Sequence, residues 1–325
     1  MQYRKVGRTG LKVSAMAMGT GFFGSYTNES DSLQIMNLAF DKGINLFDTA
    51  NSYAKGKSEE IVGKFIKNKR HQVVLATKVA LTQGPGPNDH GLSREHILWA
   101  VEESLKRLDT DYIDIYYAHT PDYTTPIEET LRALDTIVQQ GKVRYIACAN
   151  ALAYQLLKAL WVSDRYNLAR FDCIQIPYNL LTRDIEYELV PCCTGEGVGM
   201  TVFNPLAAGL LTGKHDPNKP PAPDTRFSLE RIGPVDRERY WSPANFQAVA
   251  RLKQIAGAPG KSLTQFSLAW VLNNPSISSV LIGVSSAKQL EENIGALELK
   301  MTTDEIRSCD EIWRELRPPR IFYGQ

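Results

Sequence analysis

Short apolar runs alternate with helix-length amphipathic segments along most of the 325-residue chain. Several runs, such as Val73-Val74-Leu75-Ala76, are apolar without alternation, which is typical of parallel strands covered on both faces. The strands are predicted near residues 14–19, 44–48, 73–78, 112–118, 143–148, 172–177, 199–204 and 279–284. The helices are predicted near residues 30–42, 58–67, 93–108, 127–140, 152–162, 184–196, 243–256 and 286–295. Eight such strand–helix units predict an α/β fold, the (β/α)8 TIM barrel.

The remaining segments fit around that barrel. Residues 2–6 and 11–14 flank Gly7-Arg8-Thr9-Gly10, which indicates an N-terminal hairpin. The proline-rich segment 206–242 after strand seven is predicted to be a long functional loop. An extra helix is expected at 263–273 and another in the C-terminal tail after about 302. Because the sequence contains no linker or low-complexity tract, we expect one barrel domain spanning 1–325.

Composition narrows the class of protein. Apolar residues make up 43% of the chain, enough for a large core, and the net charge of +1 does not favour nucleic acid or an anionic membrane. The five cysteines have no CxxC spacing, which predicts reduced thiols in the cytoplasm, and no cluster has the spacing of a zinc site. The N-terminus lacks the apolar region of a signal peptide, and no run approaches the ~20 apolar residues that span a bilayer.

Polar side chains stand at or just beyond the ends of three successive predicted strands. Asp48 ends strand two, Lys78 ends strand three, His119 ends strand four, and Tyr53 follows in the loop after strand two. In a closed parallel barrel the C-terminal strand ends converge on one rim, and consecutive strands are neighbours. We therefore expect these four side chains to lie close together.

These residue types suit the reduction of a carbonyl by hydride. The product alkoxide needs a proton, which a free tyrosine donates poorly because its pKa is ~10. A neighbouring lysine favours the phenolate, a carboxylate keeps that lysine charged, and a histidine can donate a hydrogen bond to the carbonyl oxygen. Taken singly, each residue is more often a cap, a packed side chain or a solvated lysine. The hypothesis of carbonyl reduction therefore depends on all four residues occurring together.

The sequence resembles the aldo-keto reductase superfamily over nearly its whole length, close to the bacterial and potassium-channel β-subunit branches. The matching motifs include Arg4–Ser14, the Asp48–Tyr53 segment, Ala76-Thr77-Lys78, Tyr117-Ala118-His119 and Gln175–Asn179. The resemblance implies a (β/α)8 barrel that uses NADPH, with Asp48, Tyr53, Lys78 and His119 as the catalytic tetrad. In the channel β-subunits the histidine position is an asparagine, so His119 favours a working reductase.

The resemblance also implies a cofactor site. Asn150 and Gln175 match the residues that hold the nicotinamide carboxamide in the family. Phe203 matches the aromatic residue that stacks on the nicotinamide ring, and Asp48 is also expected among the cofactor-binding residues. The further expected cofactor residues are Gly19, Thr20, Gly21, Asn204, Pro205, Leu206, Gly209, Leu211, Gly213, Lys214, Arg226, Gly283, Ser285, Lys288, Gln289, Glu292 and Asn293. Two positions depart from the family pattern. Ala149 replaces the serine common before the asparagine, and Lys288 is the one basic residue where many NADPH-using relatives have an arginine. We therefore expect NADPH, with NADH as the less favoured cofactor.

Three other motifs resemble nucleotide or catalytic signatures. Gly19–Gly24 spells GxGxxG, but a polar loop follows it rather than the helix of a Rossmann fold. Tyr53-Ala54-Lys55-Gly56-Lys57 spells YxxxK, but Gly56 argues against the helix that this motif needs. Gly209–Lys214 is one residue short of a P-loop and lacks its serine or threonine.

The substrate is the open question. We expect a small-molecule carbonyl, a class that includes simple aldehydes and sugar-linked ketones, or the reverse oxidation of an alcohol with Tyr53 as the base. Aromatic candidates for the pocket wall, which are alternatively ordinary packing residues, are Phe22, Phe23, Tyr123, Phe227, Tyr240, Trp241, Phe322 and Tyr323. The rival hypothesis is a cofactor-bound regulatory subunit with weak reductase activity. The sequence leaves open whether the protein is a monomer or a homo-oligomer.

Overall fold

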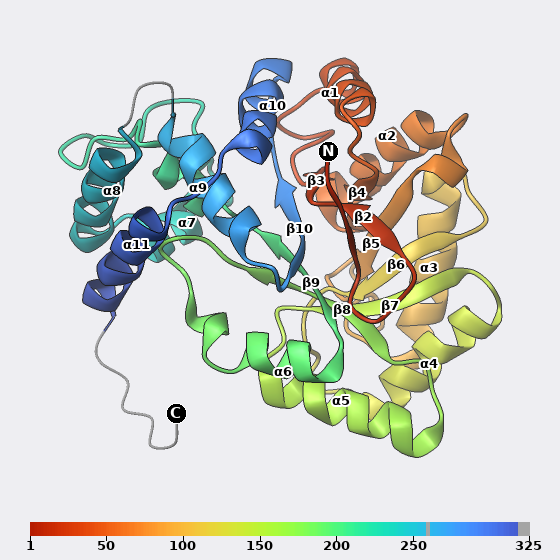
Figure 1. Cartoon of the computed structure of the whole chain (residues 1–325). Coiled ribbons are helices and arrows are strands. Elements are labelled where there is room, and N and C mark those ends of the chain that lie inside the picture. The colour runs from red at the N-terminus through yellow and green to blue at the C-terminus, as the bar shows by residue number, and fades with distance from the viewer. Residues whose placement is uncertain (258–260, 318–325) are drawn as a thin grey trace. The chain divides into compact units, whose positions relative to one another are not determined.

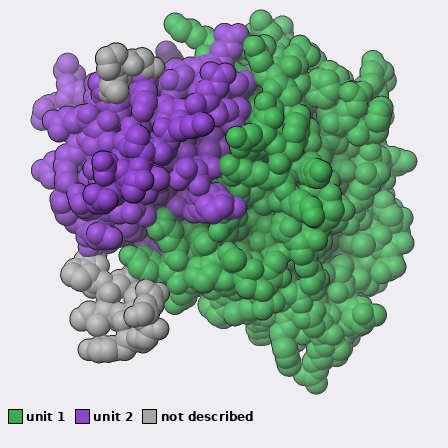
Figure 2. Space-filling model, viewed as in Figure 1, with its two compact units in different colours: residues 1–176, 185–203, 276–290 green, residues 177–184, 204–275, 291–325 purple. Residues whose placement is uncertain are grey.

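The computed structural model describes residues 1–257 and 261–317, so the predicted wall residues Phe322 and Tyr323 lie outside the described part. Its contacts divide the chain into two compact units, coloured green and purple in Figure 2. The first unit comprises residues 1–176, 185–203 and 276–290, and the second comprises 177–184, 204–275 and 291–325. The single-domain organisation stays a prediction.

The first unit contains the predicted barrel. Among the described residues, eight parallel strands close on themselves, and β10 pairs with both β3 and β9 (Figure 1). The barrel strands are β3 (Met16–Gly19), β4 (Leu46–Asp48), β5 (Val74–Val79), β6 (Ile113–Ala118), β7 (Val143–Ala149), β8 (Phe171–Pro177), β9 (Gly199–Phe203) and β10 (Ile277–Ile282). The helices between them are α1 (Glu29–Asp41), α2 (Lys57–Ile66), α3 (Arg94–Leu108), α4 (Ile127–Gln139), α5 (Ala153–Tyr166) and α6 (Leu189–Glu196). The predicted fold class is confirmed.

Alternate residues of the strands fill the barrel interior. Ala76, Tyr117 and Ala147 belong to one buried cluster with Leu46 and Leu281. The predicted hairpin pairs β1 (Tyr3–Lys5) with β2 (Lys12–Ser14), and Val6 and Val13 pack against the same cluster. The hairpin therefore extends the core beyond the barrel strands, while the opposite, C-terminal strand ends carry the polar residues.

Helix ends in the first unit follow from local sequence. Ser93 is the N-cap of α3 and accepts a hydrogen bond from the His96 backbone N–H at 3.2 Å. Gly43 and Gly141, which follow α1 and α4, have φ of +87° and +73°, the left-handed conformation common after a helix end. Such caps stop each helix close to the next strand, which keeps the βα units in register.

The second unit holds α7 (Gly233–Tyr240), α8 (Pro243–Ala256), α9 (Leu263–Asn273), α11 (Thr303–Leu316) and the end of α10 (Ala287–Ile294). The helix expected at 263–273 is confirmed. The segment 206–242, predicted as a long loop after strand seven, also contains short 3-10 turns at 207–212 and 226–228 and helix α7. No helix in the described ranges has the length and apolar content to cross a bilayer.

Candidate active site

A buried ion pair lies at the C-terminal end of the barrel strands. The Lys78 ammonium on β5 donates hydrogen bonds to the Asp48 carboxylate on β4 and, at 2.7 Å, to the Thr49 carbonyl oxygen. The Lys78 side chain is 0% exposed and that of Asp48 is 3% exposed. Burial alone would lower the pKa of Lys78, but the charge of Asp48, followed by that of Tyr53 and hydrogen bonds to both, raises it above the ordinary value. Lys78 is therefore a fixed cation inside the barrel.

Tyr53 extends from a turn that is mostly left-handed. After Tyr53, the backbone φ is +48° at Ala54, +55° at Lys55 and +89° at Gly56, and α2 begins directly afterwards. Non-glycine residues in this region cost on the order of 1 kcal/mol each, so the turn is maintained by its surroundings. The Lys78 Nζ lies 5.1 Å from the centroid of the Tyr53 ring. The turn also excludes the helix that a YxxxK motif requires, as expected.

His119 completes the cluster. It follows the last residue of β6, and its ring centroid lies 5.8 Å from that of Tyr53 in an edge-to-face arrangement. Burial, reinforced by the nearby Lys78 charge, lowers the pKa of His119 to about 3. The imidazole is therefore neutral near pH 7 and can donate one N–H. The four side chains that the sequence placed at successive strand ends lie together.

The depressed pKa of His119 predicts a pH-dependent stability. An unfolded histidine titrates near 6.5, so between pH 6.5 and about 3 the unfolded chain binds a proton that the folded chain does not. The free energy of unfolding should fall as the pH drops below 6.5, by at most about 1.4 kcal/mol per pH unit from this group. Urea unfolding at pH 7, 6 and 5 should show a shallower fall for His119→Asn than for wild type. The exposed His71, changed to Asn, is the matched control and should leave the slope unchanged.

Two amide side chains border the tetrad. The Gln175 Nε2 on β8 donates to Asp48 Oδ2 at 2.8 Å, so Asp48 accepts from both Lys78 and Gln175. Asn150 follows β7 with φ of +58°, and its Nδ2 donates to the His119 carbonyl oxygen at 2.9 Å. Both predicted clamp residues therefore contact a tetrad residue directly.

The loop after β3 approaches Tyr53. A Cβ added at Gly21 would lie 3.8 Å from two carbon atoms of the Tyr53 ring, so the loop backbone runs beside the phenol. Thr20 is fully buried and donates to the Asp48 carbonyl oxygen at 3.0 Å. Thr20 therefore supports the Asp48 segment, and the more exposed Gly19 and Gly21 are the better candidates for contact with a ligand.

The segment after β9 contains tight turns with several positive φ values. Phe203, which ends β9, packs against the barrel core in the first unit. Within the second unit, Ala207, Ala208, Gly209 and Gly213 all have positive φ, and Asn204 Oδ1 accepts from the Ala208 N–H at 2.7 Å. The amides of Ala207, Gly209 and Gly213 also donate to carbonyl oxygens within the segment, at 3.0, 2.9 and 3.0 Å. The remaining predicted residues of this segment are Pro205 and Leu211, which are buried, Leu206, which is partly buried, and Lys214, which is exposed.

Two charged cofactor candidates already have partners in the second unit. The Arg226 Nε donates to Asp236 Oδ2 at 2.6 Å, and Glu292 accepts from the Ser262 hydroxyl at 3.0 Å. Asn293 is buried. In the first unit, the Gln289 Oε1 accepts from the Ser285 N–H at 2.9 Å, which links the loop after β10 to α10. Gly283 and Lys288 are exposed there, and a Cβ added at Gly283 would meet no described atom within 4 Å.

Three of the aromatic wall candidates are buried packing residues. Phe23, Phe227 and Tyr240 are buried, and the Phe227 ring lies 5.0 Å from the rings of both His215 and Trp241. Phe22 makes an edge-to-face contact with Tyr26, whereas Tyr123 is 81% exposed. The ordinary packing alternative is therefore favoured for the buried three.

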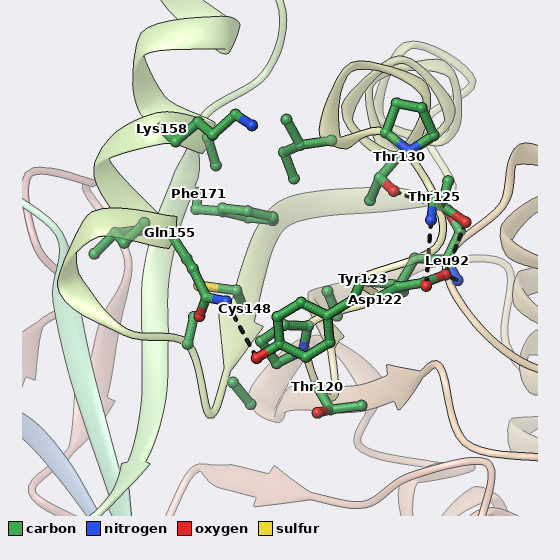
Figure 3. A pocket seen from close by; sticks show the side chains of 18 of the residues that line it. Leu92, Thr120, Asp122, Tyr123, Thr125, Thr130, Cys148, Gln155, Lys158 and Phe171 are labelled. Carbon is green, nitrogen blue, oxygen red and sulfur yellow. Dashed lines mark hydrogen bonds between the residues drawn. The ribbon is translucent and has the colours of Figure 1, made fainter.

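A separate cavity of about 450 Å³ lies on the helix side of the barrel wall in the first unit (Figure 3). It is lined by Ala118 and Cys148, whose neighbours Tyr117 and Ala147 belong to the interior core. The loop after β6 and the start of α5 form its rim, where Gln155 Nε2 donates to the Tyr123 hydroxyl at 3.3 Å. The tetrad side chains do not line this cavity.

Sequence reasoning missed the polar residues that support the tetrad. The Ser58 hydroxyl lies 2.8 Å from that of Thr20 and 2.9 Å from that of Thr49. Glu59 is 0% exposed, accepts from the Thr77 hydroxyl at 2.6 Å and pairs with Arg107 at 2.7 Å. A signal was available, because Ser58 and Glu59 immediately follow the Tyr53 turn and Thr77 precedes Lys78, but nothing in the sequence shows which side chains meet.

Comparison with known proteins agrees with the family resemblance of the sequence. The sequence model of the aldo/keto reductase family matches residues 15–314. A probable voltage-gated potassium channel subunit beta of Arabidopsis thaliana is 38% identical to the chain over 92% of both sequences. A protein of the same description from Oryza sativa subsp. japonica is 38% identical over 98% of both. The chain belongs to the aldo/keto reductase family and is an NAD(P)H-dependent oxidoreductase that acts on carbonyl groups.

Proposed function

We propose that the protein reduces an aldehyde or ketone with NADPH, or oxidises the corresponding alcohol, with Tyr53 as the general acid or base. The observation that carries the proposal is the buried Lys78–Asp48 pair beside the Tyr53 ring, which the neutral His119 contacts edge to face. Family membership supports the reaction class, and this geometry supports the assignment of roles.

The proposed roles follow from charge and hydrogen bonding. As hydride reaches the carbonyl carbon, negative charge develops on the substrate oxygen. Tyr53 donates its phenolic proton to that oxygen, and the adjacent ammonium of Lys78 stabilises the phenolate that remains. Asp48 keeps the lysine charged despite its burial. The neutral His119 donates an N–H to the carbonyl oxygen and orients it, because a buried donor needs no reorganisation during the reaction.

The cofactor proposal assigns NADPH to the residues predicted from the sequence. When bound, the nicotinamide supplies the hydride. Gln175 and Asn150 would hold its carboxamide, and Phe203 would stack on its ring. In the second unit, the segment that includes Gly209 and Gly213 is assigned to the pyrophosphate, because glycine has no side chain to prevent close approach of the backbone. In the first unit, the adenosine 2′-phosphate would be bound around the start of α10, by Ser285, Lys288 and Gln289.

Lys288 provides a test of cofactor choice. Because its exposed ammonium is proposed to contact the 2′-phosphate, which NADH lacks, wild type should have a lower KM for NADPH than for NADH. Lys288→Ala should raise the KM for NADPH about tenfold, equivalent to the ~1.4 kcal/mol of one charge-assisted contact, and leave the KM for NADH unchanged. Lys300→Ala, at another exposed lysine, is the matched control. A lower wild-type KM for NADH would contradict the NADPH assignment.

The regulatory hypothesis is retained as the second candidate because both relatives are named as probable channel β-subunits. In that case the chain would bind cofactor but turn it over slowly. These two hypotheses can be separated by measuring NADPH oxidation by wild type with a panel of aldehydes and keto-sugars. Turnover above the background of free NADPH, with product formed in equal amount, supports the reductase. Tight cofactor binding with turnover at background supports the regulatory subunit.

The proposed location is the cytoplasm. The five cysteines at 148, 173, 192, 193 and 309 are all free in the described part of the chain. Burial raises the pKa of the Cys173 thiol to about 11 and that of Cys309 to about 12, so both are poor nucleophiles. Reduced, unpaired thiols are typical of a cytoplasmic protein.

A further inference from the structure

The first turn of α2 connects three strand ends on the outer side of the barrel wall. Ser58 bonds to Thr20 after β3 and to Thr49 after β4, and its hydroxyl also donates to the Thr20 carbonyl oxygen at 2.9 Å. The next residue, Glu59, accepts the 2.6 Å hydrogen bond from Thr77 on β5. Since α2 begins immediately after the Tyr53 turn, the same helical turn is linked to the Asp48 segment, the Tyr53 turn and the Lys78 strand.

Glu59 is an unusual residue for this place. A carboxylate with no exposed surface is costly unless it is paired, and Glu59 is paired on both oxygens: Oε1 with Thr77 and Oε2 with the Nε of Arg107. An apolar residue would fill the same space without this cost. The burial of an ion pair that stability alone does not require suggests a positioning role.

Arg107 extends the contact to the Tyr53 turn. A Cβ added at Gly56 would lie 2.7 Å from the Arg107 Cδ and 2.9 Å from its Nε, so the guanidinium arm packs directly on the left-handed turn. Farther along α2, a Cβ at Gly63 would lie 2.7 Å from the Leu108 carbonyl oxygen, so α2 and α3 approach closely. Arg107 is therefore held on one side by Glu59 and covers Gly56 on the other.

Thr77 connects the same carboxylate to the lysine. Along β5, Ala76 belongs to the interior cluster, so Thr77 points to the helix side and Lys78 points inward. The bond from Thr77 to Glu59 thus fixes the strand backbone one residue before Lys78. The backbone bonds Thr49 N–H to the Ala76 carbonyl oxygen, at 2.8 Å, and Asn51 N–H to the Lys78 carbonyl oxygen, at 3.3 Å, join this strand to the loop that leads to Tyr53.

We propose that Glu59, with Thr77 and Arg107, is a positioning residue that sets the separation between the Lys78 ammonium and the Tyr53 phenol. The proposal rests on the proposed function of that pair. None of the three residues is assigned contact with substrate or cofactor. Their effect is transmitted through the β5 backbone on one side and through the Tyr53 turn on the other.

Two substitutions test this proposal by kinetics. Glu59→Gln keeps an acceptor for Thr77 but places an amide against Arg107, and Thr77→Val removes the hydroxyl at constant volume. We expect kcat to fall about 10–100-fold in Glu59→Gln and about tenfold in Thr77→Val, as expected for a misplaced catalytic group, with the KM for NADPH within about twofold of wild type. The alkaline limb of the kcat–pH profile should move to higher pH, because the ammonium stabilises the phenolate less well. Thr77→Ser, which keeps the hydroxyl, should have the wild-type kcat and the wild-type position of the alkaline limb.

The matched control is a buried ion pair far from the tetrad along the same strands. Asp114, near the start of β6, pairs with Arg70 at 2.7 Å and accepts from the Leu75 N–H at 2.9 Å. Asp114→Asn should lower the thermal midpoint at least as much as Glu59→Gln but leave kcat and its pH profile unchanged. If folded Glu59→Gln and Thr77→Val have wild-type kcat and wild-type pH profiles, the proposal is wrong.

A readout without turnover separates this proposal from the proposed function. Hydrogen exchange measured by mass spectrometry should show at least tenfold faster exchange of the Thr49 and Asn51 amides in Thr77→Val, but not in Asp114→Asn. If wild type does not turn over any carbonyl, the proposed function fails, and this exchange difference still decides whether the network holds the two segments together. Equal exchange in wild type and Thr77→Val would overturn the positioning role.

Discussion

Replacing Tyr53 with phenylalanine is expected to lower kcat about 10²–10⁴-fold, the range for loss of a general acid. The ring and its contact with His119 are retained, and Lys78 keeps its bonds to Asp48 and Thr49, so the fold and the cofactor site should be unaffected. The hydroxyl is lost, and with it the proton that would reach the substrate oxygen and the hydrogen bond with Lys78. The measurement is kcat for the best substrate of the aldehyde panel, together with NADPH affinity by fluorescence titration, which should stay within about twofold of wild type.

Tyr116 supplies the matched control for that experiment. It lies on β6 with a fully buried hydroxyl that has no hydrogen-bond partner among the described residues. Burial, followed by the charge of Glu59, raises the pKa of its phenol, so it stays protonated. Tyr116→Phe should leave kcat within about twofold of wild type. An unchanged kcat in Tyr53→Phe would remove Tyr53 from the mechanism and return the assignment of the proton donor to the other polar residues of the site.

The barrel was predictable because its signal is local and repeated. Each parallel strand is covered on both faces and carries a run of apolar residues, such as Val74 to Ala76 in β5, and caps such as Ser93 and Gly141 mark helix ends independently of tertiary contacts. The segment 206–242 was less predictable because its prolines and polar residues conceal α7, whose sequence, Gly-Pro-Val-Asp-Arg-Glu-Arg-Tyr, has no clear apolar face. Its buried Asp236 is paired with Arg226, a contact ten residues apart that periodicity does not reveal.

The tetrad was predictable for a different reason. The C-terminal ends of the strands in a parallel barrel meet at one rim, and this does not depend on how the helices between them pack. Asp48, Lys78 and His119 could therefore be placed from topology alone. The supporting residues could not be placed in this way, because Glu59 and Arg107 lie on helices, where the direction of a side chain depends on helix packing. The backbone of the Tyr53 turn was also unpredictable. Alanine and lysine rarely adopt positive φ, and tertiary contacts impose it on Ala54 and Lys55.

Replacing Lys78 with methionine is expected to give the largest combined loss of stability and activity. Methionine fills a similar volume but leaves Asp48, which is 2% exposed, with Gln175 as its remaining side-chain donor. Breaking a buried ion pair on one side typically costs about 3–5 kcal/mol, because the other charge stays desolvated and unpaired. Urea unfolding at pH 7 should show this decrease in the free energy of unfolding. The activity should fall to background, since neither the lysine nor a properly placed Tyr53 remains.

The double substitution Asp48→Asn with Lys78→Met separates stability from catalysis. Removing both charges avoids the unpaired carboxylate, and an asparagine at position 48 can still accept the hydrogen bond from Gln175. Replacing both members of a buried pair is often close to neutral, so the double variant should recover to within about 1 kcal/mol of wild type. It should nevertheless remain inactive, because the charge beside Tyr53 is absent. A single Lys78→Met variant as stable as wild type would contradict the buried ion pair, and an active double variant would show that the ammonium is dispensable for the reaction.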